Sequence, residues 1–175
     1  MLILKEITTH SHLYADAEKL LTEAFPPEER RDIATQRYVT DNNKKFQAFA
    51  IIYNFDFAGL INIWHLNGIV YIEHLAILPE LRQQGIASET LKHIKNHGRP
   101  IILEVEPATN TDSCKRIKFY EKNGFILRPI DYTQPAYAPN LPEIKMHIMT
   151  CGNIADINEI INAIKTNVYN KGIEI

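Results

Sequence analysis

Two kinds of hydrophobic spacing alternate along the chain, and each predicts one kind of element. Alternating or continuous short apolar runs predict strands over 2–7, 46–53, 58–66, 69–78, 101–106, 125–127 and 143–150. Apolar residues at helical spacing predict helices over about 12–24, 28–40, 85–97, 113–123 and 153–170. A meander of strands followed by helix-linked strands indicates an α/β fold with a mixed sheet and helices on both faces.

Turn and capping residues divide these elements. Ser11 is expected to cap the first helix and Asn153 the last one. Asn67-Gly68 is the strongest hairpin signal in the chain, and Gly98 suits the C-terminal end of the helix before it. The segment 128–142 contains four prolines and is predicted to be a long irregular loop.

Composition narrows the class of protein. The chain has 175 residues, 45% of them apolar and 23% charged, which is typical of one globular domain. No apolar run reaches the roughly 18 residues of a membrane helix, and the first residues do not resemble a secretion signal. Cys114 and Cys151 form neither a disulfide framework nor a metal-ligand pattern. We therefore expect a cytoplasmic protein without a membrane or metal partner.

A net charge of −2 also disfavours nucleic-acid binding. Lys115, Arg116 and Lys118 form a short basic cluster. They are more simply explained as a solvated helix face, although a ribose phosphate could bind there.

The stretch from Arg82 to Ser88 carries the clearest chemical signal. A strand leads through a short loop into a helix whose first residues are Gly85 and Ala87, with Arg82 beside them. The first N–H groups of a helix lack internal partners, so small residues and a cation there favour a phosphate or pyrophosphate. The spacing matches neither the dinucleotide-binding fingerprint nor the Walker loop. By itself this stretch could be an ordinary loop in which the glycine only eases a turn.

Two motifs together resemble the GNAT superfamily of acyl-CoA-dependent N-acyltransferases. Residues 82–87, Arg-Gln-Gln-Gly-Ile-Ala, fit the Q/R-x-x-G-x-G/A signature, and residues 118–125, Lys-Phe-Tyr-Glu-Lys-Asn-Gly-Phe, resemble the second signature of that family. The predicted element order also matches across 1–150. The resemblance implies a mostly antiparallel sheet that splays after its fourth strand, with 151–175 as an additional amphipathic helical extension.

The resemblance also implies acetyl-CoA as acyl donor, with no metal. The pantetheine arm would lie along Leu75, Ala76 and Ile77, like an additional strand. Ser113 stands where many relatives have an asparagine that contacts the cofactor, so that contact is either replaced or lost. The pyrophosphate site would comprise Arg82, Gln83, Gln84, Gly85, Ile86, Ala87 and Ser88.

Glu73 is the predicted general base for attack by an amine. Strand alternation places residues 71, 73, 75 and 77 on one face, which leads towards the expected thioester, and His74 on the other face. A glutamate occurs at the matching position in some small-molecule enzymes of the family. The alternative is a structural carboxylate that is hydrogen-bonded to a neighbouring loop or helix end.

Tyr120 matches the tyrosine that assists the leaving thiolate in the family, although a core aromatic is the simpler alternative. The acceptor amine is expected to meet Glu28, Glu29 and Tyr137, which lie in the segments that wall this site in the family. An ordinary charged first helical turn is the alternative for the two glutamates.

These observations predict an N-acetyltransferase that transfers acetyl from acetyl-CoA to a primary amine of a small molecule or peptide. The alternative is a non-catalytic acyl-CoA-binding or regulatory module on the same scaffold. The isoleucine stripe of the predicted tail helix must be buried, either on its own domain or in a homodimer.

Overall fold

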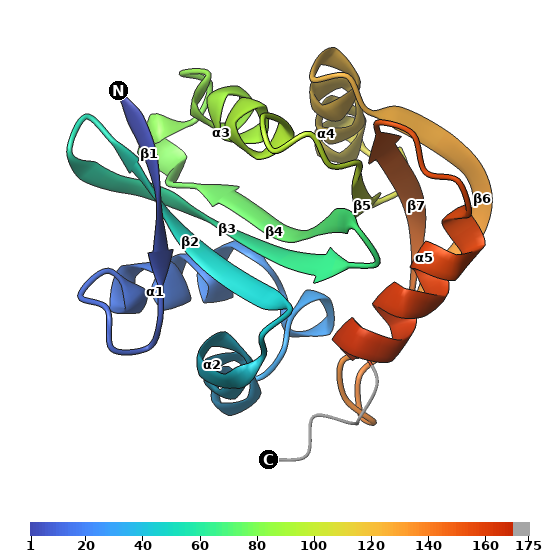
Figure 1. Ribbon diagram of the computed structural model, residues 1–175, viewed down its shortest axis with the longest axis horizontal. Helices are drawn as coiled ribbons and strands as arrows, with labels where there is room; N and C mark the ends of the chain where they lie inside the picture. The colour runs from blue at the N-terminus through green and yellow to red at the C-terminus, as the bar shows by residue number, and fades with distance from the viewer. Residues whose placement is uncertain (170–175) are drawn as a thin grey trace.

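The computed structural model describes residues 1–169, which form one seven-stranded sheet in the order β1-β2-β3-β4-β5-β7-β6 (Figure 1). All neighbouring strands are antiparallel except β4 and β5, which are parallel. The mixed α/β fold is therefore confirmed. The strands are β1 Leu2–Ile7, β2 Phe46–Tyr53, β3 Asp56–Leu66, β4 Ile69–Ile77, β5 Ile101–Val105, β6 Ile126–Gln134 and β7 Ile144–Cys151.

Helices cover both faces of the sheet (Figure 1). One face packs against α1 (Tyr14–Ala24), α2 (Ile33–Asn42) and α5 (Ile157–Ile164) in a core centred on Trp64. The other face packs against α3 (Ile86–Lys95) and α4 (Thr111–Lys122). Short turns complete the chain: η1 Pro27–Glu29, η2 Pro79–Leu81 and η3 Lys165–Tyr169, the last being a π-helical turn.

β4 and β5 separate soon after they meet. Their pairing covers only three positions, Val70 with Ile101, Tyr71 with Ile102 and Ile72 with Leu103. From His74 to Ile77, β4 is paired only with β3, so its other edge has no strand partner within the described chain. The expected opening of the sheet after its fourth strand is therefore present, and it exposes backbone hydrogen-bonding groups.

A bulge in β4 changes which side chains share a face. β3 pairs Asn62 with His74 but its next residue, Ile63, with Ile72, so Glu73 is the additional residue. The prediction that 73, 75 and 77 share a face opposite His74 is wrong. Glu73 and His74 both lie on the Trp64 side of the sheet, whereas Leu75 and Ile77 pack on the opposite side.

Several predicted element ends are also corrected. Ser11 caps no helix: its hydroxyl accepts a hydrogen bond from Thr8 N, and α1 begins at Tyr14. The segment after Pro26-Pro27 forms only the η1 turn before α2, whose first turn is capped by Asp32. Proline at the first positions suits a short helical turn. This turn ends at Glu29, and Asp32 caps the separate helix α2.

The C-terminal half departs further from the prediction. The predicted loop 128–142 is in part strand, because β6 extends to Gln134 with a register shift between Arg128 and Tyr132. The tail helix begins after Asp156, whose side chain accepts from two backbone N–H groups, and not after Asn153. Residue 170 of the predicted helix and the rest of the extension lie outside the described residues.

The isoleucine stripe of α5 is buried within the chain itself. Ile160, Ile161 and Ile164 belong to the same core cluster as Trp64 and Tyr132. The default expectation, packing on its own domain, is the one observed, and this apolar stripe is used inside the chain. Within residues 1–169, no helix is both long and apolar enough to cross a membrane.

Candidate active site

A cavity of about 310 Å³ opens where β4 and β5 separate. Its walls come from the segment between α1 and η1, from the connection between η2 and α3, from strands β4, β5, β6 and β7, from α4, from the residues after β6 and from η3. The lining residues that carry polar chemistry are Glu29, Tyr71, Glu73, Arg82, Glu104, Glu106, Arg116, Tyr120, Gln134, Tyr137 and Tyr169. Leu75, Ala76 and Ile77, predicted to meet the pantetheine arm, also line it.

A second hollow of about 390 Å³ lies at the N-terminus of α3. It shares Ile77 and Arg82 with the first cavity, so the two meet at the end of β4. Gln83 and Gly85 both have positive φ angles, 64° and 81°, and no side chain caps the helix. The first N–H groups of α3 therefore remain available, and consecutive amides in such a turn form an anion-binding concavity.

Six of the seven predicted pyrophosphate residues line this hollow, and Gln84 does not. Gln83, Gly85, Ala87 and Ser88 line it together with Arg82, whose Nε donates to the Ile77 carbonyl at 3.1 Å. Gln84 is not among the lining residues, since its amide donates to Glu80 O. Ile86 lines the hollow too, but it is 2% exposed and packs in the core below.

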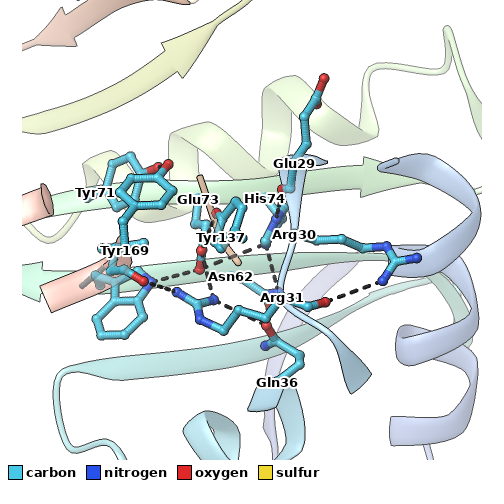
Figure 2. Close-up of polar contacts among 12 residues, drawn as sticks. Glu29, Arg30, Arg31, Gln36, Asn62, Tyr71, Glu73, His74, Tyr137 and Tyr169 are labelled. Carbon is cyan, nitrogen blue, oxygen red and sulfur yellow. Dashed lines mark hydrogen bonds and ion pairs between the residues drawn. The ribbon is translucent and has the colours of Figure 1, made fainter. Parts of the chain in front are cut away.

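Glu73 is held in a closed polar cluster (Figure 2). Its carboxylate lies 2.8 Å from Arg31 Nη1 and accepts hydrogen bonds from Trp64 Nε1 at 2.8 Å and Tyr137 Oη at 2.7 Å. Burial acts to raise its pKa, but the charge of Arg31 and the hydrogen bonds from Arg31 and Trp64 lower it to about 2. Glu73 is thus a poor proton acceptor, and the geometry favours the structural alternative over the general base.

His74 positions the η1 turn beside the cavity. Its Nε2 contacts the Glu29 carbonyl at 3.0 Å and its Nδ1 contacts Asn62 Nδ2 at 3.3 Å. A carbonyl only accepts and an amide NH₂ only donates, so the ring is the neutral Nε2–H tautomer. Burial lowers the His74 pKa, in agreement with this assignment. Gln134 Nε2 fixes the same turn by donating to the carbonyl of Glu28 at 3.1 Å.

Of the three predicted acceptor residues, Glu29 and Tyr137 line the cavity, whereas Glu28 is not among its lining residues. Burial raises the pKa of the Glu29 carboxyl, and the charge of Glu106 adds to this rise. Arg116, which pairs with Glu106 at 2.6 Å, acts in the opposite direction on Glu29.

Glu104 is a carboxylate that the sequence interpretation missed. It follows the last β4-paired residue of β5, and each of its oxygens accepts one phenol. Tyr132 donates to Oε1 at 2.5 Å and Tyr169 to Oε2 at 2.7 Å. Burial raises the pKa of Glu104 to about 7, although these two hydrogen bonds lower it. An acidic residue inside the apolar stretch Ile101–Val105 was the available signal.

Tyr120 lines the same cavity from α4, with its ring packed between Phe119 and Phe125 at 5.1 and 5.4 Å. Burial raises its pKa to about 12, so the phenol stays protonated at neutral pH. A protonated phenol can donate a proton, so Tyr120 stays a candidate donor to the leaving thiolate.

Ser113 makes its hydrogen bonds within the start of α4. It is 1% exposed, and its hydroxyl accepts from Thr109 N and Asn110 N while donating to Asn110 O. Asn110 caps the same helix reciprocally, so both side chains form a capping box. Of the two alternatives for Ser113, these hydrogen bonds favour loss of the usual asparagine contact over its replacement.

No cluster of three or more His, Cys, Asp or Glu side chains in the described part of the chain is placed to hold a metal ion. A sequence profile of the Acetyltransferase (GNAT) family matches residues 11–125, which is most of the chain and includes both motifs. The chain belongs to the GNAT acetyltransferase family.

Individual relatives agree with this GNAT assignment. A protein of Bacteroides thetaiotaomicron described as a GNAT-family acetyltransferase is 36% identical, with a TM-score of 0.89 over 95% of this chain and 98% of its own. The acetyltransferase YjbC of Bacillus subtilis (strain 168) is 30% identical over 77 residues. That match spans only 42% of this chain and 40% of YjbC.

A GNAT acetyltransferase of Elizabethkingia anophelis, solved with acetyl-CoA bound, shares the fold at a TM-score of 0.61. It is 16% identical and is matched over 87% of this chain and 98% of its own. At this identity the likeness shows the fold alone.

Proposed function

We propose that this GNAT protein transfers an acetyl group from acetyl-CoA to a primary amine, with Glu104 as the general base. The observation that carries the proposal is the position of Glu104. It is a carboxylate with a pKa of about 7, in the cavity that also contains Tyr120 and adjoins the α3 cradle. A base is most effective when its pKa lies near the working pH.

The residues on the donor side fit a nucleotide-linked thioester. The amides at the start of α3 and the Arg82 guanidinium are suited to a pyrophosphate, and Gly85 leaves the cradle open since no heavy atom lies within 4 Å of a Cβ built there. The free edge of β4 over Leu75–Ile77 offers hydrogen-bonding groups to an amide-containing arm. GNAT structures with bound acetyl-CoA and CoA support this assignment.

The proton steps are assigned to two residues of this chain. Glu104 accepts a proton from the incoming ammonium group, which frees the nitrogen lone pair. Acetyl-CoA supplies the thioester: the amine nitrogen bonds to its carbonyl carbon as the C–S bond breaks. Tyr120 donates its proton to the departing sulfur, and the second proton of the amine nitrogen passes to the resulting phenolate, which leaves a neutral amide and free CoA thiol. Glu73, already paired with Arg31, contributes by holding that wall of the cavity in place.

The acceptor is proposed to be a cationic amine of a small molecule or peptide. Glu106 is paired with Arg116 and Glu73 with Arg31, which leaves Glu29 and Glu104 as the lining carboxylates without an ion-pair partner in the described residues. A carboxylate at the cavity wall attracts a cation and orients it. Phe25 and Tyr137 add aromatic surface, which also favours cationic groups.

An amine panel tests this function, with free thiol release from acetyl-CoA as the readout. We expect turnover with at least one cationic amine, and a loss of about 10²- to 10⁴-fold in Glu104→Gln. Glu73→Gln is the comparison variant, and it should keep the acidic limb of the pH–rate profile. CoA binding measured by calorimetry should be unchanged in both variants.

Tight acetyl-CoA binding without turnover of any amine would contradict the enzyme proposal and support the non-catalytic acyl-CoA-binding module. Turnover that is retained in Glu104→Gln would leave the transferase activity in place but remove Glu104 as its base. The two failures are therefore distinguishable in one series of measurements.

A further inference from the structure

The C-terminal segment after β7 reaches the catalytic cavity, although it lies outside the matched family region of residues 11–125. α5 is followed by the π-helical turn η3, which ends at Tyr169. A π-helical turn changes the helical register, and such turns frequently occur at functional sites. Here Val168 and Tyr169 at the end of the turn are buried, 2% and 7% exposed. Tyr169 lines the cavity that contains Glu104.

Hydrogen bonding around Tyr169 has a defined direction. Its hydroxyl donates to Glu104 Oε2 at 2.7 Å, which uses its only hydrogen. The 3.0 Å contact between the Tyr71 and Tyr169 hydroxyls must therefore run from Tyr71 as donor to Tyr169 as acceptor. The resulting chain, Tyr71 to Tyr169 to Glu104, joins β4 and β5 through a residue of the tail. Figure 2 shows Tyr71 and Tyr169 beside Tyr137, whose ring lies 4.8 Å from that of Tyr169.

The tail is fixed to the same cluster by its backbone. Arg31 Nη2 donates to the carbonyl of Val168 at 3.1 Å, while Nη1 of the same guanidinium contacts Glu73. Asn167 Oδ1 accepts from Lys45 Nζ at 2.7 Å. The position of Tyr169 is thus fixed by the contacts of its neighbours with Arg31 and Lys45, and by its own hydrogen bond to Glu104 of β5.

We propose that Tyr169 is a positioning residue for the proposed base: it orients the Glu104 carboxylate, and the C-terminal segment therefore completes the acceptor half of the active site. This inference rests on the proposed function. One phenol on each oxygen, Tyr132 from β6 and Tyr169 from the tail, fixes the plane of the carboxylate. Both donors also stabilise its ionised form, which is the form that accepts a proton.

The test is the pH dependence of kcat/KM in Tyr169→Phe, which removes the hydroxyl and keeps the ring. Loss of a donor to a carboxylate raises its pKa, so we expect the acidic limb to move to higher pH by about one unit. Tyr38→Phe is the matched control, because Tyr38 is exposed on α2 and should leave the limb in place. Tyr132→Phe should move the limb in the same direction as Tyr169→Phe.

A double-variant cycle separates positioning from mere packing. If Tyr169 acts through Glu104, Tyr169→Phe should add little to the loss in a Glu104→Gln background. The carboxyl infrared band of Glu104, isolated by subtracting the Glu104→Gln spectrum, provides a readout in the unliganded protein. Its titration midpoint should rise in Tyr169→Phe without any turnover being measured.

An unmoved acidic limb and infrared midpoint in Tyr169→Phe, or an additive loss in the double variant, would overturn the inference. Tyr71→Phe provides a second route if Tyr169→Phe folds poorly, since it removes only the donor to Tyr169. It should shift the limb in the same direction by a smaller amount. Failure of Glu104→Gln to lower turnover contradicts the proposed base instead, and so the two failures remain distinct.

Discussion

Arg31 and Glu73 form an ion pair that is closed to solvent. The distance between Arg31 Nη1 and Glu73 Oε1 is 2.8 Å, and the two side chains are 3% and 0% exposed. The rings of Trp64 and Tyr137 lie 5.1 and 5.3 Å from the guanidinium carbon. The pair joins the segment before α2 to the bulge in β4, directly beside the candidate active site.

Removing one member of this pair should be strongly destabilising, because the other charge would remain buried without a partner. We expect Arg31→Met to lower the free energy of unfolding by about 3–5 kcal/mol. The double variant Arg31→Met/Glu73→Gln should recover part of this loss. Urea denaturation measures both. Arg37→Met is the control, since the Arg37 side chain in its ion pair with Glu18 is 54% exposed. Equal losses in Arg31→Met and Arg37→Met would contradict the prediction.

Glu104 should make folding less favourable as the pH rises. Its pKa is raised from 4.5 to about 7 in the folded chain, so between these values the folded state binds more protons than the unfolded state. Stability from this group is therefore highest below pH 4.5 and falls until the pH passes 7. Relative to Glu104→Gln, the wild type should lose about 3 kcal/mol over this window.

Unfolding free energies of the wild type and Glu104→Gln, measured at about pH 4 and about pH 8 on either side of this window, test the effect of the raised Glu104 pKa. Glu73 does not interfere, because both proteins contain it and its lowered pKa of about 2 affects them equally. A difference between the two proteins that is the same at both pH values would show that Glu104 titrates normally.

The α3 cradle predicts a position-specific effect of a carboxylate. Gly85→Glu should weaken CoA binding by at least about tenfold, because the new charge opposes the pyrophosphate. Gly98→Glu is a matched control: both glycines have positive φ, 81° and 69°, with nothing within 4 Å of an added Cβ. The two variants thus share the backbone strain. Calorimetry should show near-normal CoA affinity in Gly98→Glu and weakened affinity in Gly85→Glu. Equal CoA affinities in the two variants would show that the cradle is not part of the binding site.

Tyr120 should affect turnover without changing the base. Tyr120→Phe removes the proton donor to the leaving sulfur and should lower kcat by about 10²-fold. Its acidic limb should match that of the wild type, because Glu104 is untouched. Tyr53→Phe, another partly buried tyrosine packed on the same core cluster, serves as the control. If kcat falls equally in both variants, the loss is caused by disturbed packing, and Tyr120 does not donate the proton to the leaving sulfur.

Features that depend on neighbouring residues were predictable from the sequence. The order of helices and strands follows from hydrophobic period, and the cradle at Gly85 and the tyrosine at 120 follow from short motifs. In each case the determining interactions lie within one or two turns of the chain. Strand β5 was also predicted, but its polar residue Glu104 gave no local sign of its partners.

Features that depend on distant segments were decided by the tertiary structure. The bulge opposite Asn62 places Glu73 and His74 on one side of the sheet, and strand alternation within β4 cannot reveal an additional residue. Glu104 obtains its proton affinity from burial and from tyrosines that lie 28 and 65 residues away in sequence. A pKa is set by surrounding charges, donors and solvent exclusion, and these exist only once the chain has folded.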